Sequence, residues 1–231
     1  MTDPTTPRTT LTRARVLGTA VALADREGID RLTMRSLAAE LGVEAMSLYH
    51  HVANKEDLLD GVADAIAGEM QVAVADLPAP APSEWKAALR RRILTAREVM
   101  LRHPWAPGVF ESRTGFGPQI VRYTDGFVGL LRLGGLSHDL VHHAMHALGS
   151  RAYGFTQELF DPAGSGDADA SPEMLAQMAT EAPHLVEMLA HIAHDPPGAT
   201  LGRCDDQSEF EFGLDLLLDG LERRAAREPG A

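Results

Sequence analysis

Three histidines stand four residues apart, at His138, His142 and His146. On a helix their imidazoles lie along one face, one turn apart, with His143 beside them. Neutral imidazoles on successive turns are a recurring zinc arrangement, and Asp139 or a second subunit could supply a further ligand. Histidines without neighbouring cysteines or an HExxH pattern more often line a pocket or an interface through ordinary hydrogen bonds, which is the interpretation we favour. A metal sensor or a metal-dependent enzyme is the alternative.

Other signatures of catalysis are missing from the sequence. It contains no nucleotide-binding phosphate loop, nucleophile elbow, zincin motif or redox motif. The lone cysteine, Cys204, has no internal partner for a disulfide. Arg90, Arg91 and Arg92 are consecutive and therefore fan around a helix; we expect a solvated face, although one of them could meet an acidic ligand. We expect a protein that is not an enzyme and needs no cofactor.

The acidic charge of the chain is concentrated outside its first quarter. The net charge is −12, but residues 1–55 contain seven Lys/Arg and six Asp/Glu, hence +1, which leaves −13 for the rest. Arg8, Arg13 and Arg15 form a basic run that suits contact with phosphates. With 231 residues, of which 45% are hydrophobic and 23% charged, the chain can bury a substantial core. No apolar run is long enough to span a membrane and residues 1–10 are polar, so we expect no membrane partner and a cytoplasmic location.

The periodicity of the sequence indicates an all-α fold. Apolar residues recur at three- and four-residue spacing, and almost nothing strand-like is found between the breaks. Three stretches rich in Pro, Gly and Asp interrupt this pattern, at residues 77–83, 161–172 and 195–206.

Four helices fit into about the first 75 residues. The expected N-caps are Thr12, Thr33 and Asn54, the last with Asp57 as a near capping box. The first helix is expected to stop at Gly28, a suitable left-handed C′ residue, and the second to be closed by Gly42. A short third helix is expected over about residues 44–52.

The second and third of these helices have the spacing of a helix-turn-helix. Ala38 leaves room where the two helices cross, and Gly42 permits the turn between them. An ordinary helical hairpin could share both residues, but it does not require the exposed run Tyr49-His50-His51 on the second helix. The inward-facing residues are expected to be Leu37, Leu41, Val43 and Leu48.

Residues 11–66 resemble the DNA-binding domain of the TetR family of regulators. The resemblance rests on Gly28-Ile29, Leu32 to Ala38, Leu41-Gly42-Val43, Leu48 to Val52 and Asn54 to Leu59, and the run LYHHVANKEDLLD is similar to the tetracycline-repressor branch. It implies a three-helix DNA-binding domain followed by a larger helical domain for ligand binding and dimerisation. The expected divisions are a flexible arm at 1–10, the DNA-binding domain at 11–56, the larger domain at 57–227 and a tail at 228–231.

The resemblance also implies which residues contact DNA. They are Thr33 and Arg35 from the second helix, Ala45, Met46, Ser47, Tyr49, His50 and His51 on the reading face, and Lys55 at a phosphate. The chemistry agrees, because hydroxyl, imidazole and ammonium groups bond phosphate oxygens, whereas Arg35 can reach a guanine edge. The tetracycline repressor has a polar base-reading residue where this sequence has Ala45 and then Met46, so we expect a different operator.

The function expected from these features is a homodimeric repressor, released from a palindromic operator by a small hydrophobic or aromatic ligand. Residues 109–112 offer no histidine for a magnesium-bound tetracycline, which argues against that ligand. The dimer is expected to form through residues 138–160 and 209–224, with Leu214 in the interface. A DNA-binding protein without a ligand is a third possibility. The expected pocket residues are Trp105, Phe110, Tyr123, Phe127, His142, Met145, His146, Phe155 and Met178.

Overall fold

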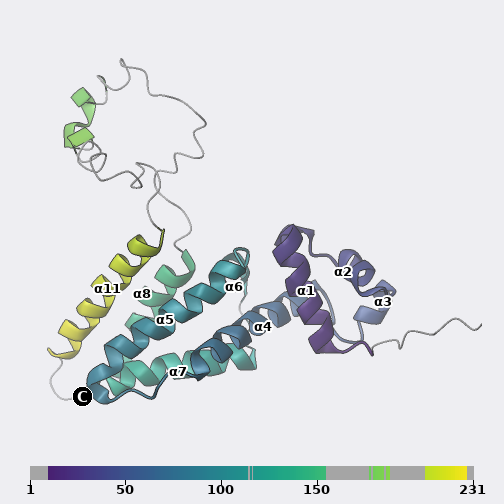
Figure 1. Ribbon diagram of the computed structural model, residues 1–231, viewed down its shortest axis with the longest axis horizontal. Helices are drawn as coiled ribbons and strands as arrows, with labels where there is room; N and C mark the ends of the chain where they lie inside the picture. The colour runs from purple at the N-terminus through teal and green to yellow at the C-terminus, as the bar shows by residue number, and fades with distance from the viewer. Residues whose placement is uncertain are drawn as a thin grey trace, which may run out of the picture.

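The computed structural model describes residues 10–113, 115, 117–154, 177, 179–184, 186–187 and 206–227. Every regular element in these ranges is helical, which confirms the all-α prediction. In Figure 1, α1, α2 and α3 gather at one end, and α4 leads from them to the other helices. No helix in this part of the chain is long and apolar enough to cross a membrane. The helices are α1 (Arg13–Glu27), α2 (Met34–Leu41), α3 (Ala45–Leu48), α4 (Lys55–Ala75), α5 (Trp85–Arg102), α6 (Ala106–Ser112), α7 (Pro118–Leu133), α8 (His138–Gly154) and α11 (Asp206–Ala225), with 3₁₀ turns at Ile29–Arg31 and Pro82–Glu84.

The three predicted N-caps are confirmed. Thr12 and Asn54 each accept a hydrogen bond from a backbone amide of the first helical turn, at 3.2 and 2.8 Å. Thr33 forms a reciprocal capping box with Ser36, in which each side-chain oxygen accepts from the other residue's amide, at 3.0 and 2.9 Å. These caps fix where α1, α2 and α4 begin.

The two predicted C-terminal glycines both have positive φ. Gly42 closes α2, as expected, and is left-handed, with φ 66° and ψ 35°. Gly28 has φ 87° but ψ 154°, so its conformation is extended in ψ and not left-handed helical. The prediction for Gly28 was therefore right about the positive φ and wrong about the region.

The third helix is shorter than predicted. It ends at Leu48, and residues 49–51 form a turn in which the amides of His51 and Val52 both bond to the Leu48 carbonyl, at 2.8 and 2.9 Å. Asn54 already caps α4, so the chain has to change direction within a few residues, and a helix running to residue 52 does not fit.

The predicted break at residues 77–83 is confirmed between α4 and α5. Residues 161–172 and most of 195–206 lie outside the described residues, and α11 begins at Asp206. The sequence analysis missed three further breaks, which separate α5 from α6, α6 from α7 and α7 from α8. Pro104, Pro107, Pro118 and the pair Gly134-Gly135 mark them.

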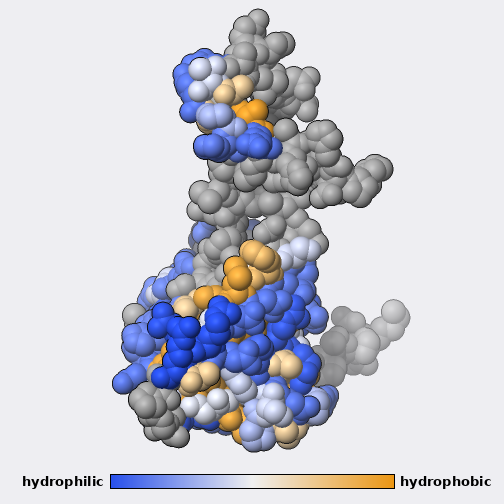
Figure 2. All heavy atoms as spheres, turned by 90° about the vertical axis from the view of Figure 1, so that its left-hand side faces the viewer, coloured by the Kyte–Doolittle hydropathy of each residue, from blue (hydrophilic) through white to orange (hydrophobic). Residues whose placement is uncertain are grey.

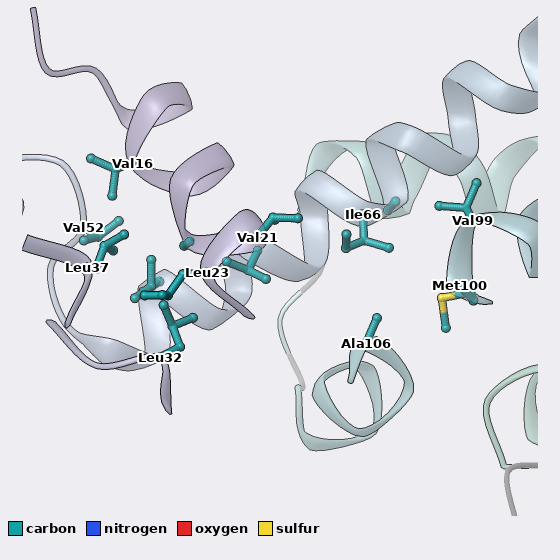
Figure 3. Packing of buried hydrophobic residues seen from close by; sticks show 14 of the residues in the cluster. Val16, Val21, Leu23, Leu32, Leu37, Val52, Ile66, Val99, Met100 and Ala106 are labelled. Atoms are coloured by element: carbon teal, nitrogen blue, oxygen red, sulfur yellow. The ribbon is translucent and has the colours of Figure 1, made fainter. Parts of the chain in front are cut away.

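A first hydrophobic core joins α1, α2 and α3 to the middle of the molecule. Figure 3 shows it extending from Val16, Leu37 and Val52 to Val99 and Met100. On α4 this core contains Leu58, Val62 and Ile66, so the division expected after residue 56 lies inside one helix and one continuous core. Of the helices in the first 50 residues, α1 packs directly against α4, and α2 and α3 contribute to the same core.

A second core lies between α5, α7, α8 and α11. Its buried residues include Trp85, Leu89, Leu131, Leu136, Ala144, Leu148, Phe210, Leu214 and Leu218. Across its edge, Arg90 bonds Asp215 at 2.7 and 3.2 Å and Glu211 at 2.6 Å, and Lys86 pairs with Asp219 at 3.1 Å and with Glu222. The expectation of a solvated face is thus wrong for Arg90.

Candidate nucleic-acid interface

The turn between α2 and α3 is rigidly bonded. The Gly42 amide lies within hydrogen-bond distance of the Ala38 and Ala39 carbonyls, and the Val43 amide bonds to the Ala38 carbonyl at 3.0 Å. Ala38 and Leu48 are buried in the first core, as predicted. This packing fixes the angle of α3 against α2 and leaves the opposite side of α3 free to contact another molecule.

The residues expected to read DNA differ in exposure. Met46 is 72% exposed and Tyr49 45% exposed, although both are large and largely apolar. Such side chains exposed side by side on a rigid element indicate a binding surface. Thr33, Arg35, His50 and Lys55 are exposed, whereas Ala45, Ser47 and His51 are half-buried. The Thr33 hydroxyl already serves the α2 capping box.

An ion pair missed by the sequence analysis holds this surface in place. Arg13 of α1 bonds both carboxylate oxygens of Asp57, at 2.7 and 3.2 Å, and also donates to the His51 carbonyl at 2.6 Å. Asp57 accepts from the Ala53 amide at 2.7 Å, so it does not complete the expected capping box with Asn54. The hydrogen bond from Arg13 lowers the pKa of Asp57 and raises that of Arg13.

A second polar cluster connects α1 with the corner between α5 and α6. His103 is only 6% exposed, and its two ring nitrogens lie 2.7 Å from Asp25 of α1 and 3.2 Å from Glu69 of α4. The Trp105 indole also donates to Asp25, at 2.7 Å. These contacts join the corner directly to α1.

The middle of α4 is bonded to the start of α7. Asp64 accepts from the backbone amides of Gln119 and Ile120, at 2.8 and 3.1 Å. Nearer the start of α4, Arg113 pairs with Glu56 and lies 3.6 Å from Asp60. Both ends of the α6–α7 loop are thus attached to α4 by charged or capping contacts.

The residues expected to line a pocket do not form one group. Trp105, Phe110 and Tyr123 pack against the first core, and Phe127 and Met145 against the second. His142 and His146 are exposed on α8. Phe155 and Met178 lie outside the described residues.

The three histidines lie on one helix, α8, as their spacing predicts. The rings of His142 and His146 are 4.7 Å apart and edge-on, and His138 is also exposed. Among the residues that the structure describes, no group of three or more His, Cys, Asp or Glu could hold a metal ion. The metal-binding alternative gains no support from these residues.

Comparison with known proteins identifies the family. Residues 16–62 match the family described as bacterial regulatory proteins, tetR family, and residues 77–225 match the tetracyclin repressor-like C-terminal domain. The chain belongs to the TetR family. As a TetR-family protein it is a DNA-binding transcriptional regulator, and its C-terminal helices form the part in which the family binds small molecules and dimerises.

Some relatives of this TetR-family chain match nearly all of it, and others match less than half. The HTH-type transcriptional repressor DrrR1 of Streptomyces coeruleorubidus is 33% identical, over 97% of this chain and 82% of the repressor. The class D tetracycline repressor of Escherichia coli is 40% identical over 40% of this chain and 41% of its own. The structure of ActR from Streptomyces coelicolor with (S)-DNPA has a TM-score of 0.72 and 28% identity, over 94% of this chain and 100% of that chain.

Proposed function

We propose that this protein is a homodimeric repressor that binds a palindromic operator through α2 and α3 and leaves it when a small hydrophobic or aromatic ligand binds. The observation that carries the proposal is the exposure of Met46 on α3 and of Tyr49 just after it. The turn at Gly42 holds the start of α3, and the Arg13–Asp57 ion pair holds the segment that follows it. Membership of the TetR family supports it. Because such a protein acts by binding, we infer that it is not an enzyme, and that it works in the cytoplasm, where the operator is.

The proposed contacts divide into phosphate-binding and base-reading groups. Tyr49, Lys55 and the two histidines carry donors that suit phosphate oxygens. Arg35 carries a guanidinium that can bond a guanine in two places, and the apolar tip of Met46 suits a thymine methyl. The remaining proposed contacts are Thr33, Ala45 and Ser47. Domains at 11–56 and 57–227, with an arm at 1–10 and a tail at 228–231, are retained as the functional division, although one core crosses it.

The proposed dimer interface uses the outer face of α11 together with α8. Phe212 and Leu216, one turn apart, are 64% and 55% exposed, and Figure 2 shows apolar side chains lying among hydrophilic ones on the side of the molecule where α11 lies. A second subunit would cover them. Leu214, which the sequence analysis placed in the interface, is 1% exposed in the chain's own second core, so that placement was wrong.

The proposed release mechanism follows from binding linkage. ActR has been solved with (S)-DNPA and with actinorhodin, which supports a small-molecule effector for this chain. The effector has to prefer the conformation that does not bind DNA, and a tenfold loss of operator affinity requires a preference of about 1.4 kcal/mol. The route from ligand to DNA would run through the α5–α6 corner and its contacts with Asp25, because these reach α1 directly.

Selection of duplexes from a random pool, followed by fluorescence anisotropy, tests the proposal. We expect a short palindrome and a steep loss of affinity with salt, because bound Lys and Arg release counterions. Tyr49→Ala and Lys55→Ala should each weaken binding, whereas Val72→Ala, at a residue of similar exposure to Met46, should not. Wild-type affinity in both Tyr49→Ala and Lys55→Ala would show that α3 does not contact the operator.

A further inference from the structure

Arg92 is a charged residue buried in the C-terminal part of the molecule. Its side chain belongs to α5 and is 8% exposed. Nη2 donates to the Tyr123 carbonyl at 2.8 Å and lies 3.4 Å from the Gln71 side-chain oxygen, and the guanidinium stands 4.5 Å from the centre of the Tyr123 ring. Nε is buried and has no hydrogen-bond partner. Burial lowers the pKa of Arg92 from its ordinary value.

Arg90 has the carboxylate partners that Arg92 lacks in the described part of the chain. Arg90 lies on the same helix and is paired with the carboxylates of Asp215 and Glu211. Among the residues that the structure describes, Arg92 meets no carboxylate, and its three contacts are with neutral groups. Burying a cation without a counter-anion is unfavourable, and buried charges are ordinarily paired. A binding protein can tolerate such a site when its ligand supplies the missing charge.

The surroundings of Arg92 leave space for its guanidinium and include a small hollow. Gly126 of α7 faces it so closely that a Cβ there would lie 2.8 Å from Nη2. Beside it is a hollow of about 160 Å³, which is smaller than the roughly 300 Å³ or more of a site for a whole drug-sized molecule. The walls of the hollow are mostly apolar and come from α4, α5, α7 and the segment between α4 and α5; they include Val74, Leu77, Ala88 and Leu130. The charged residues that line it are Arg91 and Arg92.

We infer that the effector of this protein is an aromatic carboxylic acid, and that its carboxylate enters the hollow between α4, α5 and α7 and pairs with Arg92. This inference rests on the proposed function, because it names the chemical class of the effector. The apolar walls contact the aromatic ring of the effector next to its carboxylate, and Arg91 adds a second positive charge to the lining of the hollow. The size of the hollow limits what it holds to the acidic end of a larger molecule or to a small acid.

Calorimetric titration with matched acids and amides tests the inference. The probes are benzoate and 1-naphthoate, each compared with its neutral amide. Wild-type protein should bind at least one acid more tightly than its amide. Arg92→Met should weaken binding of that acid by about tenfold or more, the loss of one charge-assisted hydrogen bond, and weaken binding of the amide much less, because its neutral carbonyl forms a weaker bond. Arg92→Lys should retain part of the preference, and Arg91→Met, at an exposed position, should change it much less.

The same preparations separate this inference from the proposed function. Operator binding without any probe is measured for the wild type and for Arg92→Met, and both should bind, because Arg92 is remote from α3 and the apolar replacement suits a buried position. Added acid should then weaken operator binding by the wild type only. If neither acid is preferred over its amide, or if Arg92→Met binds the acid or responds to it as the wild type does, the inference is overturned while operator binding stands. Failure of the wild type to bind any selected duplex would instead refute the proposed function.

Discussion

Arg13 and Asp57, 44 residues apart in the sequence, bind each other through two hydrogen bonds and together clamp the chain between α3 and α4. Arg13 holds the carbonyl of His51, and Asp57 holds the amide of Ala53. The segment that carries the proposed DNA contacts is thus fixed from α1 on one side and from α4 on the other. The position of this segment therefore depends on the negative charge of Asp57, which protonation at low pH removes.

We expect Asp57→Asn to lower the free energy of unfolding by about 1 kcal/mol near neutral pH, because the pair is partly exposed. The pKa of Asp57 is lowered in the folded state, so its contribution is present above the ordinary value of 3.8 and is lost as the pH falls through the folded value. The difference between wild type and variant should therefore shrink between about pH 7 and about pH 3. Urea unfolding at both pH values measures it, with Asp30→Asn, at an exposed residue of the same region, as the control. An equal difference at both pH values would contradict this account.

Met46→Gln should change operator preference at one position of each half-site. The methionine is 72% exposed and offers only apolar contact, whereas glutamine can bond the edge of an adenine, which is worth about 1–3 kcal/mol of discrimination. Selection from random duplexes with each protein compares the two consensus sequences. Identical sequences would mean that Met46 does not face the bases.

Replacing both Phe212 and Leu216 by lysine should produce folded monomers with reduced operator affinity. Both side chains are exposed, so their loss should leave the chain's own cores intact while placing charge in the subunit interface. Light scattering gives the mass, and the same change at Val72 and Val121, also exposed, is the control. Leu214→Ala should instead cost about 2–5 kcal/mol of stability, since Leu214 is a core residue. If the variant with lysine at both Phe212 and Leu216 is still a dimer, the interface lies elsewhere.

Two glycines of the α7 region should respond oppositely to alanine. A Cβ on Gly134 would lie 2.5 Å from the ring of Trp85, which is itself buried, so Gly134→Ala should destabilise by about 1–3 kcal/mol. Nothing lies within 4 Å of a Cβ on Gly129, inside the helix, so Gly129→Ala should stabilise by roughly 0.5–1 kcal/mol. Thermal or urea unfolding of both variants gives the signs. If both substitutions change the stability in the same direction, the packing described for Gly134 is refuted.

Local chemistry made the helix ends near α2 and α3 predictable. Threonine and asparagine caps at Thr12, Thr33 and Asn54, and the left-handed glycine at Gly42, depend on a few adjacent residues, so the sequence contains all the information they need. The end of α3 was harder to predict. It is determined by the position of α4 and by Arg13, which is far away in the sequence, and not by the residues of α3.

Contacts between distant helices were not predictable from periodicity. A pattern of apolar residues shows that Leu214 is buried but not whether its own chain or a second subunit covers it. The arginine triplet shows the same limit. Its members have the same chemistry, yet Arg90 is paired with α11, Arg92 is buried against α7 and Arg91 is exposed to solvent.

The position of α11 in the sequence affects the order in which the two cores form during synthesis. All buried residues of the first core lie between Val16 and Ala106, so that core can close early during synthesis. The second core needs Phe210 and Leu214, and Asp215 follows its partner Arg90 by 125 residues, roughly 6–25 s at ordinary rates of translation. For that time the emerging chain has the helices proposed to contact DNA but no completed α8–α11 surface. Under the proposed interface, a ribosome that stalls in this interval produces a chain that cannot pair with a second subunit and so cannot occupy both halves of an operator.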